Sequence, residues 1–186
     1  MTTTETQPTQ AAARFTVDPS HTTVGFSVRH MMITNVRGNF GKVEGSVTYD
    51  PANPEASKIS ATVDIASIDT REEKRDEHLR SADFFDAAAH PAMTFESRKI
   101  TRKGDDLEVV GDLTIRGTTR EVKLEVEDIT AEHVDPWGNR RIGASAKGKI
   151  KRSDFGMVWN SALEAGGVLV GDEVKINIEV SLVKQA

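Results

Sequence analysis

Residues 107–127, LEVVGDLTIRGTTREVKLEVE, decide the fold. In the first half, an apolar residue or glycine occupies every second position from 107 to 115. In the second half, valine or leucine at positions 122, 124 and 126 alternates with charged residues, and the turn residues Arg116-Gly117-Thr118 separate the two halves. Because the side chains of a strand point alternately to its two faces, this stretch predicts two antiparallel strands that share one apolar face.

The same alternation recurs along most of the chain. It indicates an all-β protein with about eight antiparallel strands, joined mainly by hairpin-length turns. The segment 24–40 is too long for one straight strand, so we expect it to bend near residues 31–35. We expect the other strands at residues 14–18, 43–49, 59–65, 93–103, 142–150 and 174–182.

Residues 69–91 break this pattern and contain the one predicted helix. Thr70 and Glu73 have the spacing of a capping box, so we expect a short helix at about residues 71–80. Leu79 is its strongly apolar residue. A helical turn is expected at about residues 82–86, where Phe84 and Phe85 stand between two acidic residues. We expect the helix and the turn to lie across one end of the sheet, with both phenylalanines inserted into it.

One short helix is too small to shield the apolar face of about eight strands from water. A second sheet could pack against it, or the sheet could close on itself, which also removes its edges. The order of the strands is meander-like, and the last strand is long enough to pair with the first. We therefore favour an up-and-down barrel over a sandwich, with an interior that is filled by side chains or holds one small ligand.

The inward-facing residues are aliphatic and nearly free of charge. Only 5% of the residues are aromatic, which disfavours a sugar site built on ring stacking and favours a long apolar guest. Alternation alone does not distinguish a packed core from a cavity. Small residues at inward positions favour the cavity, because a filled barrel needs bulk there. These residues are Gly38, Ala61, Gly111, Ala144, Ala146 and Gly148.

Composition excludes several classes of function. The formal net charge of -5 and the absence of a basic cluster argue against a nucleic-acid partner. The chain has 0 cysteines, which excludes disulfides, thiolate zinc sites and cysteine nucleophiles, and agrees with a reducing compartment. No apolar run approaches the roughly 20 residues that cross a bilayer as a helix.

The first 13 residues have neither a basic start nor an apolar core, so they do not read as a secretory signal. We interpret residues 1–13 as a disordered N-terminal tail and residues 14–185 as a single domain. A cytoplasmic location is expected on the same grounds.

Several short motifs together are specific, although each alone is weak. They are Asp18-Pro19-Ser20-His21, Phe26 with His30, Val36-x-Gly38-x-Phe40, Arg75-Asp76-x-His78-Leu79-x-Ser81-x-Asp83-Phe84-Phe85-Asp86, Gly111-x-Leu113-Thr114-Ile115-x-Gly117-x-Thr119 and Arg152-x-Asp154-Phe155-Gly156-Met157. With them, the chain from about Phe15 to Val183 resembles the YceI-like family of lipid-binding proteins. The resemblance implies a lipocalin-like barrel that binds polyisoprenoids, isoprenoid quinones or fatty amides in its lumen without catalysis. Members of that family are often periplasmic.

The expected site is the lumen of the barrel and its mouth. The expected ligand-binding residues are Val24, Phe26, Val28, His30, Phe40, Phe84, Phe85, Phe95, Leu113, Ile115, Leu124, Met157, Trp159, Ile176 and Ile178. Structural polar roles are expected for Asp18, His21, Arg75, His78 and Asp83. Neither a cofactor nor a metal is predicted, because the five histidines show no His-x-x-x-His spacing.

Two polar side chains keep alternative interpretations. His30 lies on the apolar face of its strand, where it is either a buried imidazole satisfied by the backbone or a carboxylate, or a contact for a ligand head group. His78 is either a clasp between the helix and the barrel mouth, with Asp83 or Arg75 as its partner, or a ligand contact, and we favour the clasp. Asp18, Ser20 and His21 do not form a hydrolase triad, because neighbours in sequence rarely converge.

Three functions follow from these observations. The leading one is non-enzymatic binding, transport or storage of a long isoprenoid-like lipid. The second is an enzyme that acts on a lipid-soluble substrate through His30 or His78. The third is an interaction module whose charged helix meets a partner. A homodimer is an open alternative for the oligomeric state.

Overall fold

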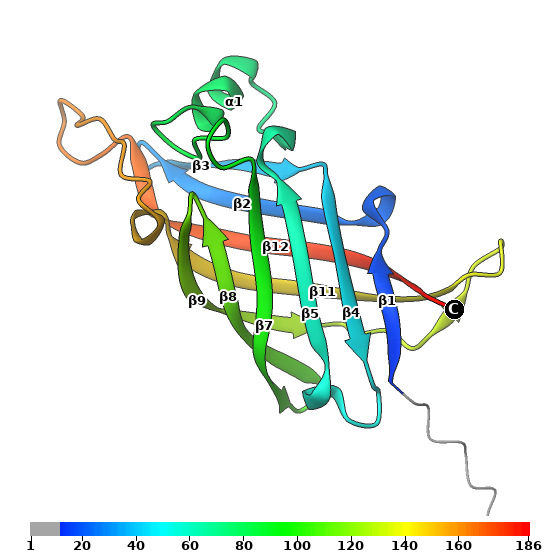
Figure 1. The fold of residues 1–186 in the computed structure, drawn as a ribbon. Coiled ribbons are helices and arrows are strands. Elements are labelled where there is room, and N and C mark those ends of the chain that lie inside the picture. Colours follow the sequence, from blue (N-terminus) through cyan, green and yellow to red (C-terminus); the bar gives the residue numbers. More distant parts are fainter. Residues whose placement is uncertain (1–11) are drawn as a thin grey trace, which may run out of the picture.

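Most of the chain is β-strand in the computed structural model, which describes residues 12–186 (Figure 1). Within these residues, the barrel consists of β1 (Ala13–Val17), β4 (Val43–Tyr49), β5 (Lys58–Asp64), β7 (Ala92–Lys103), β8 (Asp106–Ile115), β9 (Thr118–Glu127), β11 (Arg140–Lys151) and β12 (Val170–Lys184). Each strand pairs antiparallel with the next one in this order, and β12 returns to pair with β1. The predicted eight-stranded antiparallel up-and-down barrel is confirmed.

The closure of the barrel depends on β1, which is paired along both of its edges. Phe15 is opposite Val47 of β4 on one side and opposite Lys184 of β12 on the other. Closure leaves the eight strands without an open edge between the first and the last, which removes a template for aggregation.

Residues 24–40 form a hairpin, and the predicted bend was wrong. Strand β2 (Thr23–His30) pairs antiparallel with β3 (Thr34–Phe40), and the amide of Ile33 donates to the carbonyl of His30 at 3.1 Å. The turn carries methionine and isoleucine instead of the glycine or asparagine that usually announces a hairpin. Strand β2 continues along the edge of β12 beyond the end of β1.

The remaining elements are short. They are the 3-10 helices η1 (Pro19–His21), η2 (Pro54–Ala56), η3 (Ile65–Ser67) and η4 (Arg152–Phe155), the two-residue strands β6 (Ile68–Asp69) and β10 (His133–Val134), and the α-helix α1 (Glu73–Arg80). Figure 1 shows α1 and the turn after it above one end of the barrel.

The start of α1 differs from the predicted capping box. The Glu72 carboxylate caps the helix, accepting from the amides of Lys74 at 3.2 Å and Arg75 at 2.7 Å. Thr70 is buried instead, and its amide and hydroxyl both donate to Asp76. The Thr70 hydroxyl bonds the Asp76 side chain and does not cap the helix. As a result, α1 begins two residues later than predicted.

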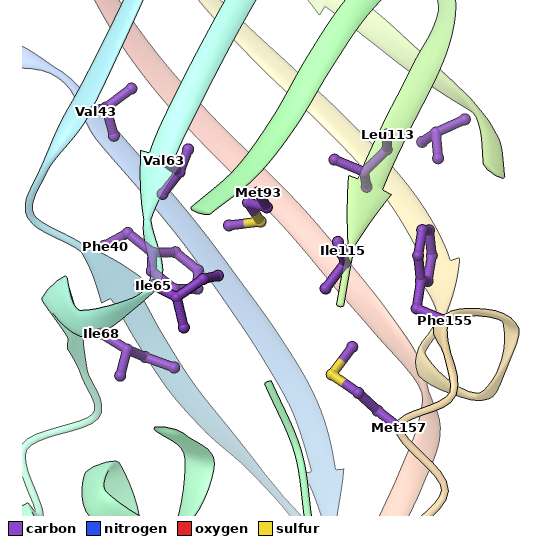
Figure 2. Packing of buried hydrophobic residues seen from close by; sticks show 11 residues of the cluster. Phe40, Val43, Val63, Ile65, Ile68, Met93, Leu113, Ile115, Phe155 and Met157 are labelled. Atoms are coloured by element: carbon purple, nitrogen blue, oxygen red, sulfur yellow. The ribbon is translucent and has the colours of Figure 1, made fainter. Parts of the chain in front are cut away.

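The largest group of buried apolar side chains lies toward the end of the barrel that α1 covers. Figure 2 shows how side chains from several strands and from η4 converge there. Two smaller groups, one around Phe15, Ile142 and Leu182 and one around Ile100, Leu107 and Val109, lie farther along the barrel. The core is thus a set of clusters on the inner wall.

Most of the predicted N-terminal tail lies outside the described residues. Within them, Ala13, the last residue of that predicted tail, already belongs to β1. No helix in residues 12–186 combines the length and the apolar composition needed to cross a membrane.

Candidate ligand-binding cavity

The barrel encloses a cavity of about 310 Å³. All eight barrel strands and β2 contribute side chains to its wall, because every second residue of each strand points inward. The wall is almost entirely apolar, and among the described residues that line it Arg152 is the one charged side chain. The volume is at the lower end of the range for small-molecule sites, which is roughly 300–1,000 Å³.

Three glycines on the inner wall lie beneath neighbouring side chains. A Cβ atom at Gly38 would lie 2.5 Å from the ring of Phe26, its cross-strand partner, and one at Gly111 would lie 2.5 Å from the ring of Phe95. Gly148 is covered in the same way by Leu124. We expected the space above these glycines to be empty, and this was wrong, because neighbouring side chains fill it. The glycines let large side chains lie flat against the wall instead, whereas Ala61, Ala144 and Ala146 do line the cavity.

One end of the cavity is covered by α1 and the turn after it. Leu79, Phe84 and Phe85 from this segment line the cavity. The edge of the Phe85 ring faces Phe40 of β3, with 5.8 Å between ring centroids. The predicted helix and turn across one end of the barrel are confirmed, and both phenylalanines point into the lumen. We call α1 together with residues 81–86 the lid.

A cluster of rings joins the lid to the loop that precedes β12. The His78 ring lies 5.0 Å from that of Phe84 and 4.7 Å from that of Trp159, between centroids, and its Nε2 atom is 2.8 Å from an Asp83 carboxylate oxygen. His78 therefore contacts Asp83, one of its two expected partners. The other, Arg75, instead donates to the hydroxyl and the carbonyl of Thr70.

Arg152 lines the cavity, although its charge gave no reason to expect it there. It is buried, with 6% of its surface exposed. Its guanidinium donates to four backbone carbonyls, those of Met157, Trp159, Val170 and Gly171, at 2.8–3.2 Å. Burial lowers the pKa of Arg152, and the nearby carboxylate of Asp172 opposes this effect. The side chain thus holds both ends of the loop against the barrel wall.

A second hollow of about 450 Å³ lies at the opposite end of the barrel. Tyr49, Leu107, Ile129 and Ile142 line both this hollow and the main cavity. The second hollow also has charged residues in its wall, among them Arg102 and Lys184. The apolar lumen therefore adjoins a more polar vestibule at the end that the lid does not cover.

Comparison with known proteins identifies the family to which this barrel belongs. A family model described as the YceI-like domain matches residues 15–182. The chain belongs to the YceI-like family. The resemblance inferred from the motifs is thereby confirmed.

Curated relatives named Protein YceI are similar over most of their length. The one from Escherichia coli O157:H7 is 40% identical over 146 residues, which is 77% of this chain and 76% of that protein. The one from Salmonella newport is 37% identical over 176 residues, or 94% of this chain and 88% of that protein.

Solved structures of similar proteins share the barrel. The crystal structure of BcnA from Burkholderia cenocepacia matches with a TM-score of 0.78 and 26% identity, over 89% of this chain and 98% of that one. The YceI protein of Campylobacter jejuni matches with a TM-score of 0.72 and 35% identity, over 85% and 90% of the two chains. A polyisoprenoid binding domain from Saccharophagus degradans, implicated in plant cell wall breakdown, has a TM-score of 0.66 at 15% identity, over 94% and 100%, and so shares the fold.

The structure of this YceI-like chain brings most of the predicted site residues together. Of those expected to bind ligand, all except His30 and Trp159 line the cavity. His30 is half-buried at the end of β2 and makes no side-chain hydrogen bond within residues 12–186, so it is not a buried imidazole satisfied by the backbone or a carboxylate. Its contact with a ligand head group stays a prediction. Trp159 packs on Phe84, which lines the cavity, and does not line the cavity itself.

Sequence reasoning missed many other wall residues of the YceI-like barrel. Most have the same inward parity as the predicted ones, so applying the alternation to every strand would have found them. They include Val17, Val47, Ile59, Val109, Ile142, Val174 and Leu182. Arg152 carries no such signal, because a charged residue is ordinarily assigned to the surface.

A polar cluster of the YceI-like chain, distant from the lid, holds Asp18 and His21. Asp18 accepts from Arg141 at 2.6 Å and lies 2.8 Å from the His21 ring nitrogen. These two contacts, the one with Arg141 above all, lower the pKa of Asp18 to about 2. Arg141 also contacts Asp135 at 2.6 Å, so it links η1 to the β10–β11 turn. The structural role expected for Asp18 and His21 stays a prediction.

Within residues 12–186, no group of three or more histidine or acidic side chains is placed to hold a metal ion. His21 and His78 each contact one carboxylate in separate parts of the molecule.

Proposed function

We propose that this YceI-like protein binds one long apolar lipid of the isoprenoid type in its barrel, and carries or stores it. The observation that carries the proposal is the closed apolar wall around the cavity of about 310 Å³. Such a wall offers a water-insoluble chain burial on all sides and offers a polar metabolite almost no hydrogen bonds.

Burial of the ligand would supply the affinity. Each 100 Å² of apolar ligand surface removed from water contributes about 2.5 kcal/mol, before the cost of ordering the chain is subtracted. The branched aliphatic residues of the wall suit a methyl-branched chain. The name of the Saccharophagus domain mentions polyisoprenoid binding, but at 15% identity the argument for this chain rests on its own cavity.

A binding role without catalysis agrees with the chemistry of the wall. A catalytic site needs a nucleophile or a proton-transferring group that can reach the substrate. Arg152, the charged wall residue among those described, is occupied by four backbone carbonyls. His30 and His78 do not line the cavity, so a substrate in the lumen would meet neither ring.

The proposal is tested by filling the lumen. Ala146 lines the cavity on β11, so Ala146→Trp, or the milder Ala146→Leu, should block an extended ligand. Lys149→Trp, three residues along the same strand at an exposed position, is the matched control. A polyprenol and a long-chain isoprenoid quinone are titrated into each protein, and the melting temperature is measured.

We expect both probes to raise the melting temperature of the wild type and of Lys149→Trp, and to leave that of the lumen variants unchanged. A shift that persists in both folded lumen variants would mean that the lipid binds elsewhere. Turnover of either probe that is lost in His30→Ala or His78→Ala would instead favour an enzyme.

A further inference from the structure

An exposed apolar surface lies beside the lid. It consists of Met31, Met32 and Ile33 at the tip of the β2–β3 hairpin and Val168 in the loop before β12, and we call it the lip. Ile33 is 73% exposed and Met32 is 60% exposed. Contiguous apolar side chains of this kind are unusual on a soluble protein surface and mark contact sites.

The backbone of the lip makes this composition more unusual. Met31 and Met32 have positive φ angles of 50° and 62°. The loop between the paired residues His30 and Thr34 has three residues. A turn in which two successive residues have positive φ angles favours glycine and asparagine, which adopt left-handed backbone at little cost. Two methionines here cost folding free energy and expose apolar surface, so the fold alone does not account for them.

The two parts of the lip are joined to each other. The amide of Met31 donates to the carbonyl of Leu169 at 2.8 Å. The Met32 sulfur lies directly over Gly167, where a Cβ atom would be only 2.1 Å from it. The hairpin tip and residues 167–169 therefore present one continuous surface.

The lip also continues the wall of the lumen. Val28 and Val170 line the cavity, and they lie three and two residues away from the lip residues Met31 and Val168. Figure 1 shows the hairpin tip and the loop before β12 together at one side of the barrel, next to α1. The lip therefore lies next to strand ends that contribute side chains to the cavity wall.

Two free cations stand just behind the lip. Arg29 and Arg37 are both on the outward parity of the hairpin and are diagonal neighbours, since Arg29 pairs with Asn35 and Arg37 with Ser27. Both side chains are exposed. Within residues 12–186 neither makes a side-chain hydrogen bond or an ion pair. The loop of the lip also contains one exposed acid, Glu164.

We propose that the lip docks on an anionic membrane surface. The methionines and Ile33 enter the boundary between head groups and acyl chains, and Arg29 and Arg37 meet lipid phosphates. This combination of an apolar tip with basic residues behind it is what interfacial binding requires. This inference rests on the proposed function, because a protein that carries an insoluble lipid has to contact a bilayer to load or release that lipid.

The test is sedimentation of the protein with vesicles of phosphatidylcholine mixed with phosphatidylglycerol, and with vesicles of phosphatidylcholine alone. The variants are Met32→Ser/Ile33→Ser and Arg29→Gln/Arg37→Gln. Val134→Ser/Trp137→Ser is the matched control, because these residues are 62% and 80% exposed at the β10–β11 hairpin, far from the lip. Circular dichroism and thermal melting confirm that each variant folds.

We expect the wild type and the control to bind the mixed vesicles, and added salt to weaken that binding. Loss of two arginines should weaken it roughly 25-fold, at about 1 kcal/mol for each cation near the surface. The wild type should bind vesicles of phosphatidylcholine alone more weakly than the mixed vesicles, and Met32→Ser/Ile33→Ser should lose binding to both kinds. Equal binding by lip variants and wild type would overturn the proposal. A second result would also overturn it. If the wild type binds no vesicles, and sedimentation velocity shows that it is a dimer whereas the lip variants are monomers, the lip contacts a second copy of the chain.

Lipid binding in the lumen and membrane docking through the lip can be tested separately. Ala146→Trp should still bind vesicles and should not bind a polyprenol in the lumen. The lip variants should still show the melting-temperature shift with a polyprenol in detergent, while transfer of that polyprenol between vesicles becomes slower. If the wild type binds no polyprenol but does bind vesicles through the lip, the proposed function fails and the docking surface stands.

Discussion

Gly38 determines where the Phe26 ring lies inside the barrel. A Cβ atom at this position would be 2.5 Å from the ring and 2.8 Å from the Thr70 side chain, so both neighbours would have to move. Phe26 is part of the cavity wall, and Thr70 holds Asp76 of the lid. A single methyl group therefore affects the lumen and the lid together.

We predict that Gly38→Ala destabilises the protein by about 1–3 kcal/mol, the usual cost of overpacking, and pushes the Phe26 ring into the lumen. Urea unfolding measures the first effect, and polyprenol titration should show weaker binding. Gly41→Ala is the control, since the closest atom to its Cβ would be 4.0 Å away. Equal stability and affinity in the two variants would contradict this role of Gly38.

At the scale of elements, the loop between η4 and β12 is held by Arg152. Replacement by methionine would leave four backbone carbonyls without their donor. We predict that Arg152→Met lowers the free energy of unfolding by about 2–4 kcal/mol, because buried acceptors lose their partners. Amide hydrogen exchange should become faster at residues 157–170 before the rest of the barrel.

The neighbouring Lys151 is exposed and makes no side-chain hydrogen bond within residues 12–186, so Lys151→Met is the matched control. It should change stability by no more than about 0.5 kcal/mol. Similar exchange in the two variants would show that the loop is held in another way.

The seam between η1 and the β10–β11 turn should respond to acid. The pKa of Asp18 is about 2, below its ordinary value of 3.8, because Arg141 and then His21 stabilise the carboxylate. A carboxylate whose pKa is lower in the folded than in the unfolded state stabilises the fold at pH values above its unfolded-state pKa. This stabilisation is lost as the pH falls through the folded-state pKa. We predict that the contribution of Asp18 declines between pH values of about 4 and 2.

Arg141→Met tests this prediction by urea unfolding at several pH values. At neutral pH the variant should be less stable than the wild type, because Asp18 and Asp135 lose their shared partner. The difference should shrink as the pH falls toward 2, where Asp18 becomes protonated in the wild type as well. Part of it should remain there, because the effect of burial on the pKa of Asp135 is outweighed by hydrogen bonds from Arg141 and Asn139, which hold this pKa lower still. A difference that is constant across this range would mean that Arg141 acts by packing alone.

At the scale of the whole molecule, the closed apolar interior explains why the sequence predicted so much of the fold. Alternation with a period of two fixes which side chains enter a closed barrel, so the inward residues of segments such as 107–115 could be assigned without coordinates. The β2–β3 turn escaped detection because Met31 and Met32 occupy a backbone conformation that they normally avoid. The role of Thr70 was not predicted because its hydroxyl bonds the buried Asp76 side chain instead of capping the helix. The burial of Arg152 was not predicted because four backbone carbonyls, two of them in the distant residues Val170 and Gly171, surround its guanidinium.

The assembly and the location of the molecule stay predictions. The sequence leaves a homodimer as an open alternative and favours a cytoplasmic location. The charged face of α1 is less available to a partner than its composition suggested. Glu72 caps the helix and Arg75 donates to Thr70, so an interaction module would depend on other exposed residues such as Lys74 and Glu77.

The most direct test of the central claim is denaturing mass spectrometry of the purified protein after mild isolation. We predict that the wild type releases a long isoprenoid-like lipid, at about one molecule per chain, and that Ala146→Trp releases none. A wild-type protein that releases no lipid, and whose melting temperature does not change when a polyprenol or an isoprenoid quinone is added, would contradict it.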